Sequence, residues 1–210
     1  MSSASAPIVL LGASYAGGWQ LPPVAGRPVV NKGVAGQQSW EMLERFDRDV
    51  VASHPSAVIV WGYINDIFRS SREDVARAQT RARASFEEMI RKARAAGIEP
   101  IVATEVPMSQ NESWSEWLAW LVGSALGKQS YQDYINARVA ELNAWLRDVA
   151  RREHILLLDL HGAVADASGN RRKGLSNEDG SHISPAGYAA LTQYAVPLLE
   201  LHFRQPARSH

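Results

Sequence analysis

The 210-residue sequence contains no cysteine. This absence excludes disulfide bonds, thiolate nucleophiles and cysteine-ligated zinc or iron–sulfur sites, and it leaves the redox compartment undecided. Five of the six histidines form no pair at the spacing of metal ligands, so we expect no metal and no cofactor. These five are His54, His154, His161, His202 and His210.

The sequence also lacks an excess of charge and a long apolar run. Lys plus Arg and Asp plus Glu both total 22, which gives no indication of a nucleic-acid partner. The longest apolar stretch, "WLAWLVGSALG", is too short to span a bilayer. No Lys or Arg precedes the first apolar run, so a signal peptide is not indicated. We expect a soluble cytoplasmic protein, with a secreted protein whose signal peptide has been removed as the alternative; the oligomeric state is undecided.

Short β-branched or leucine-rich runs alternate with helical patterns along the chain. Such runs without polar alternation are typical of strands covered on both faces. The predicted strands are 7–12, 28–34, 57–63, 99–106 and 154–160, and the predicted helices are 39–54, 71–97, 131–154 and 184–203. Alternation of this kind predicts a single α/β domain over residues 1–210, a three-layer α/β/α sandwich around a five-stranded parallel sheet.

Residues 108–130 form an unusually long connection and carry three tryptophans spaced three apart. One interpretation is a short helix packed on the core. The other is a lid or a wall for an acyl chain beside the active site. The tryptophans are Trp114, Trp117 and Trp120.

The stretch "GASYAGGW" follows the first predicted strand, where an open α/β sheet binds its ligands. A dinucleotide site would require G-x-G-x-x-G there and an acidic residue at the end of the next strand. The second of those glycines is Ser14 here, and the next strand ends in Asn31-Lys32-Gly33. These residues favour a serine nucleophile, and a nucleotide site remains the weaker alternative.

A serine nucleophile needs a base and an acid that orients the base. Near the C-terminus, "DGSH" separates Asp179 from His182 by two residues. Ser184 and Pro185 follow as a helix start, so the pair would lie in a compact turn before the last helix. The alternative is an ordinary polar loop.

The oxyanion that forms during acyl transfer needs hydrogen-bond donors. Two predicted strand ends offer them: Gly36 in "NKGVAG" and Asn65 in "GYIND". A turn glycine and a helix cap are the alternative explanations for these two residues.

Together these four stretches resemble the SGNH hydrolases, also called the GDSL esterase/lipase family, over residues 8 to about 190. The resemblance implies a flavodoxin-like strand order and the roles of the matching residues. Ser14 would be the nucleophile, with Asp179 and His182 completing the triad. The backbone amides of Ser14 and Gly36 and the side chain of Asn65 would form the oxyanion hole.

Two positions depart from the family motifs. Ala13 replaces the aspartate of G-D-S, and Tyr63 stands where G-x-N-D has glycine. Tyr63 could crowd the site or shape an acyl pocket, and we name Tyr15, Trp19, Tyr63, Trp114 and Trp117 as candidate pocket residues. The basic stretch 170–174, "NRRKG", is interpreted as a surface loop, with attraction of anionic substrates as the alternative.

The resemblance predicts a serine esterase that hydrolyses carboxylic esters, with short-chain acyl or acetyl esters as the expected substrates. A carbohydrate O-deacetylase or an acyltransferase would use the same site. A dinucleotide-binding protein and a catalytically inactive binding module are the alternatives from other classes.

Overall fold

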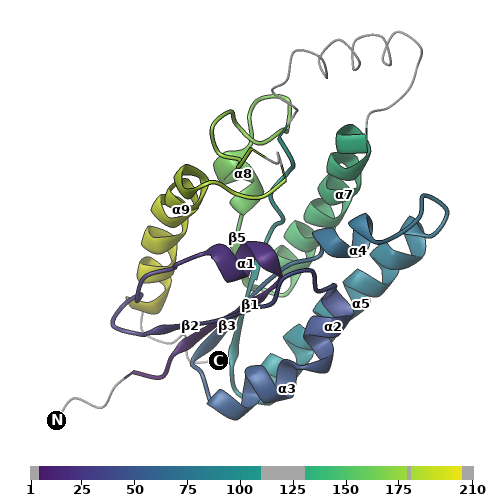
Figure 1. Ribbon diagram of the computed structural model, residues 1–210. Helices are drawn as coiled ribbons and strands as arrows, with labels where there is room; N and C mark the ends of the chain where they lie inside the picture. The colour runs from purple at the N-terminus through teal and green to yellow at the C-terminus, as the bar shows by residue number, and fades with distance from the viewer. Residues whose placement is uncertain (1–4, 110–130, 179–180, 205–210) are drawn as a thin grey trace, which may run out of the picture.

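The computed structural model describes residues 5–109, 131–178 and 181–204 and contains a five-stranded parallel sheet (Figure 1). The strand order is β2-β1-β3-β4-β5, which is the predicted flavodoxin-like order. The strands are β1 (Ile8–Gly12), β2 (Val29–Gly33), β3 (Ala57–Trp61), β4 (Glu99–Ala103) and β5 (Leu156–Leu158). The α/β sandwich fold is therefore confirmed.

The central strands β1 and β3 are buried along their whole length, which is why their sequences show no alternation. Every observed strand lies within its predicted range, and all but β1 end earlier than predicted. The residues that follow β3 and β4, such as Gly62 and Thr104, leave the sheet and form turns. Those turns supply the polar groups of the site described below.

Two layers of helices cover the sheet (Figure 1). One face carries the short helix α1 and the C-terminal helices, and the other face carries the remaining helices. The first layer comprises α1 (Ser14–Gly18), α8 (Leu160–Val164) and α9 (Pro185–Arg204); the second comprises α2 (Ser39–Glu44), α3 (Phe46–Asp49), α4 (Ile64–Phe68), α5 (Val75–Ala95) and α7 (Tyr131–Arg152), with a 3₁₀ turn at Val51–Ser53.

The helix predicted over 39–54 is broken at Arg45, contrary to the prediction. The Arg45 guanidinium is buried and donates to the Gly12 carbonyl (3.0 Å), the Gln37 side chain (2.6 Å) and the Asp49 carboxylate (2.7 Å). Gln38 caps the start of α2, and the Ser39 hydroxyl donates to the carboxylate of Asp66.

The start of α9 agrees with the prediction. The Ser184 hydroxyl accepts a hydrogen bond from the Gly187 backbone N–H (3.1 Å), and the Ser184 backbone carbonyl accepts one from the Tyr188 N–H (2.9 Å). These two bonds make Ser184 the N-cap of α9. Helix α9 continues through Pro197 and ends at Arg204, so Pro197 does not terminate it.

No helix in the described ranges is both long enough and apolar enough to cross a membrane. The segment 110–130, which holds Trp114, Trp117 and Trp120, lies outside the described residues. The same is true of Asp179.

Helix α1 packs on β2 through a contact between two backbones. A Cβ added at Gly33 would lie 2.1 Å from the Gly17 nitrogen, whereas a Cβ added at Gly17 would lie 3.4 Å from the Gly33 oxygen. The contact therefore requires glycine at position 33 and leaves room for a methyl group at position 17.

We predict that Gly33→Ala lowers the free energy of unfolding by about 2 kcal/mol or more, because neither backbone can yield without displacing α1. Gly17→Ala, the matched control in the same contact, should stay within roughly 1 kcal/mol of the wild type because alanine favours the helix. Urea denaturation of both variants measures the difference. Equal losses in the two variants would contradict this account of the contact.

Candidate functional site

Ser14 lies at the carboxyl end of β1, as the first residue of α1, and is half-buried. The preceding turn is tight: a Cβ at Gly12 would lie 2.2 Å from the Trp61 carbonyl oxygen. The Gly12 carbonyl accepts the Val34 N–H (3.0 Å) and the guanidinium of Arg45 (3.0 Å). These bonds anchor the turn in which Ala13 replaces the family's aspartate.

Gly36 and Asn65 lie in neighbouring segments, and a hydrogen bond connects Asn65 to Gln37, the residue after Gly36. The Asn65 side chain donates from Nδ2 to the Gln37 carbonyl (2.9 Å), directly after Gly36. Gly36 has φ +76°, a left-handed conformation that favours glycine. Because a primary amide carries two N–H groups, one fixes the orientation of Asn65 and the other is left for a ligand.

The buried carboxylate of Asp66 fixes the helix that begins next to Gly36 and Asn65. Asp66 accepts the Ser39 backbone N–H (2.8 Å) and the Ser39 hydroxyl (2.9 Å), which fixes the start of α2 beside the 34–37 turn. Burial raises the pKa of the Asp66 carboxyl to about 6, against the opposing effect of these hydrogen bonds.

His182 lies in the turn before α9, and this turn contacts the residue after Ser14. The Tyr15 hydroxyl donates to the Ser181 carbonyl (2.6 Å), and the Tyr15 and His182 rings meet edge-on with centroids 6.2 Å apart. The Tyr188 hydroxyl donates to the Tyr15 carbonyl (3.0 Å). The segments that carry Ser14 and His182 are therefore side by side.

Arg171 connects these segments to the turn after β4. The residue is 3% exposed. It donates to the carbonyls of Pro107 (2.8 Å), His182 (2.8 Å) and Ser181 (2.9 Å), and to the hydroxyls of Tyr15 (3.1 Å) and Ser176 (3.2 Å). The interpretation of 170–174 as a surface loop is thus wrong for Arg171.

Tyr63 is not a pocket wall, because its ring is buried against Phe86 and its hydroxyl donates to the Asn143 side chain. The Tyr63 backbone N–H donates to the carboxylate of Glu105 (3.2 Å), which is 1% exposed. Burial raises the pKa of Glu105 to about 8, an effect that the charge of Arg171 opposes. The turn after β3 thus rests on a polar cluster in the interior.

Trp19 is also in the core, where its ring meets Trp61 edge-on and its Nε1 donates to Thr192 (2.9 Å). It also lines a cavity of about 530 Å³ between α1 and α9 that includes neither Ser14 nor His182. The cavity is lined by Gly18, Trp19, Gln20, Asn177, Ile183, Pro185, Tyr188, Ala189 and Thr192. Among the other candidate pocket residues, Tyr15 contacts the His182 turn, and Trp114 and Trp117 lie outside the described residues.

The described residues include no cluster of three or more His, Asp or Glu side chains arranged to hold a metal ion.

The model of the GDSL-like lipase/acylhydrolase family matches residues 11–190, most of the chain. The chain belongs to this family. The protein is accordingly a carboxylic ester hydrolase of the GDSL-like type. No curated protein matches this acylhydrolase.

Three solved structures illustrate how far the likeness of fold extends. A protein from Desulfitobacterium hafniense assigned to the G-D-S-L family of lipolytic proteins has a TM-score of 0.72 at 23% identity, over 93% of this chain and 100% of that one. A lipase/acylhydrolase from Enterococcus faecalis has a TM-score of 0.68 at 19% identity, over 94% and 96%. A catalytic mutant of an acetylxylan esterase from Geobacillus stearothermophilus has a TM-score of 0.63 at 17% identity, over 95% and 96%.

Sequence reasoning missed the buried polar residues that hold the acylhydrolase site in place. Thr104 and Glu105 lie inside the predicted strand 99–106 but after the observed end of β4 at Ala103, so the rule that drew attention to Ser14 missed them because the strand was predicted too long. Arg171 had no such signal. It stands next to Arg172 in the same basic stretch, and nothing in the sequence indicates that Arg171 is buried while Arg172 is exposed.

We predict that Arg171→Met lowers the turnover number for an ester substrate about 100-fold, because the His182 turn loses its attachment to α1 and the site loses its geometry. Arg171→Lys should recover only part of the loss, since an ammonium group cannot reach as many acceptors. Arg172→Met is the matched control. Turnover near the wild-type value in a folded Arg171→Met protein would show that the turn keeps its position without the guanidinium.

Proposed function

We propose that this acylhydrolase cleaves short-chain acyl or acetyl esters through a Ser14–His182–Asp179 triad and an acyl-enzyme. One observation supports the proposal: Ser14, the 34–37 turn and Asn65 follow the carboxyl ends of β1, β2 and β3, and the turn that carries His182 contacts Tyr15. The contact of Tyr15 with the His182 turn and the bond from Asn65 to Gln37 are its strongest support.

In the proposed mechanism His182 removes the hydroxyl proton of Ser14 as the Ser14 oxygen attacks the ester carbonyl. Asp179 would hold the imidazole in the required tautomer and stabilise its positive charge. The tetrahedral intermediate collapses, and the alcohol leaves with the proton from His182. Water, deprotonated by His182, then attacks the acyl-enzyme and releases the carboxylic acid and Ser14.

The backbone amides of Ser14 and Gly36 and the second N–H of Asn65 would hold the oxyanion during both steps. The left-handed conformation of Gly36 and the bond from Asn65 to Gln37 support this assignment, since both are arranged before a substrate binds. Donors that need no rearrangement are the most effective in stabilising developing charge.

A carbohydrate O-deacetylase is the second candidate. The likeness of fold to the acetylxylan esterase from Geobacillus stearothermophilus favours it. Transfer of the acyl group to a sugar or alcohol instead of water would use the same acyl-enzyme.

The decisive experiment compares wild type with Ser14→Ala on p-nitrophenyl acetate, butyrate and octanoate, together with an acetylated xylooligosaccharide. We expect wild type to prefer the short chains and Ser14→Ala to lose nearly all activity, because the acyl-enzyme cannot form. Ser168→Ala, a substitution at an exposed serine, is the control. Equal activity in wild type and Ser14→Ala would rule out Ser14 as the nucleophile.

For the oxyanion hole we predict that Asn65→Ala lowers the turnover number by about 100-fold, or roughly 3 kcal/mol in the activation barrier. Part of the loss could come from the 34–37 turn, which Asn65 also holds. Urea denaturation of Asn65→Ala measures this contribution separately, because Asn65→Asp would lose the bond to Gln37 as well: a carboxylate cannot donate to a carbonyl. A near-normal turnover number in Asn65→Ala would remove Asn65 from the oxyanion hole.

A further inference from the structure

We propose that Arg69 gives the site a preference for esters that carry a second, negatively charged group. The inference rests on the proposed function, because it takes Gly36 and Asn65 as the groups that bind the carbonyl oxygen. It adds a substrate class that the triad and the oxyanion hole do not specify.

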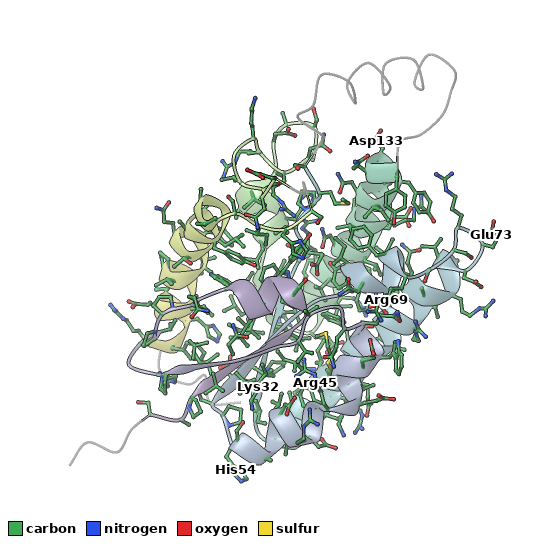
Figure 2. The ribbon with its side chains drawn as sticks, viewed as in Figure 1. Lys32, Arg45, His54, Arg69, Glu73 and Asp133 are labelled. Carbon is green, nitrogen blue, oxygen red and sulfur yellow. The ribbon has the colours of Figure 1, made fainter. Side chains whose placement is uncertain are left out.

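The position of Arg69 follows from helix geometry. Arg69 is four residues after Asn65, and its backbone N–H donates to the Asn65 carbonyl (3.1 Å). Side chains four residues apart lie on the same side of a helix, so Arg69 and Asn65 both face the 34–37 turn. Figure 2 labels Arg69 near the end of α4 and close to α2.

The guanidinium of Arg69 lies directly over Gly36. Its Nη2 atom is 2.9 Å from the point that a Cβ at Gly36 would occupy. Position 36 favours glycine because of its left-handed φ, and the absence of a side chain there leaves the Arg69 guanidinium free to lie against its backbone. A substrate whose carbonyl oxygen is held by Gly36 and Asn65 would bring its neighbouring atoms close to this cation.

The guanidinium of Arg69 makes no hydrogen bond or ion pair with any residue in the described ranges, and the side chain is exposed. Arginines elsewhere in the described chain are engaged. Arg45 and Arg48 bind Asp49, Arg77 binds Asp74, and Arg72 stacks on the ring of Tyr134.

The carboxylates of the adjoining segments are bound elsewhere. Asp66 accepts two hydrogen bonds from Ser39, and Glu41 accepts the backbone N–H of Gln38 (2.8 Å). A ligand carboxylate would therefore meet a guanidinium that needs no displacement of a protein partner. The planar fork of a guanidinium matches a carboxylate in a two-bond arrangement.

The test uses two pairs of esters that differ only by methylation of a carboxylate. The acyl pair is mono-p-nitrophenyl glutarate and its methyl ester, and the alcohol pair is 4-acetoxybenzoate and its methyl ester. The measured quantity is the ratio of kcat/KM for the anionic ester to that for the neutral ester. Comparing this ratio between variants cancels the intrinsic reactivity of the two esters.

We expect Arg69→Gln to lower the ratio roughly tenfold in at least one pair, and Arg69→Lys to lower it less. The pair that responds tells whether the charge lies on the acyl or the alcohol side. The wild-type ratio should fall as ionic strength rises, because salt screens an exposed charge. Arg72→Gln, which removes the same charge three residues away, is the control.

A ratio that changes less than twofold in Arg69→Gln for both pairs would overturn the inference while leaving the proposed function intact. An equal change in Arg72→Gln would also overturn it, because the effect would then come from net charge. If wild type hydrolyses none of the four esters, the proposed substrates fail instead. Calorimetry of mono-p-nitrophenyl glutarate binding to Ser14→Ala and Ser14→Ala/Arg69→Gln then decides: weaker binding by the double variant supports the inference, and equal or absent binding overturns it.

Discussion

The hydrogen bonds of the Arg171 guanidinium are the interaction on which the arrangement of the site depends. They join three segments that are far apart in the chain: the turn after β4 at Pro107, the residue after Ser14, and the turn that carries His182. A buried cation is costly unless all its donors are used, and here carbonyls and hydroxyls supply the acceptors. Any other relative position of the segments would leave donors of this cation unpaired.

The carboxyl ends of the strands rest on a layer of buried polar groups. Asp66 fixes the start of α2, and Glu105 accepts the backbone N–H of Tyr63. The pKa values of both carboxyls are raised by burial, to about 6 and about 8. Fixed polar groups of this kind keep the turns above them rigid, which an oxyanion hole requires because its donors act without rearrangement.

Much of the fold could be predicted because its signals are local. Apolar runs such as 57–63 mark strands covered on both faces, and Ser184-Pro185 marks the start of α9. The break at Arg45 and the burial of Tyr63 could not be predicted. Both depend on partners distant in sequence: the Gly12 carbonyl for Arg45, and the side chain of Asn143 for Tyr63.

The sequence by itself determined the fold class, the order of the four motifs and the identity of Ser14, Gly36, Asn65 and His182 as candidates, because these follow from local patterns and their spacing. Only the tertiary structure decided which of two adjacent arginines, Arg171 or Arg172, is buried, and it alone brought Arg69 over Gly36. The physical reason is that the role of a charged side chain is set by the acceptors and backbone around it, and these come from distant parts of the chain.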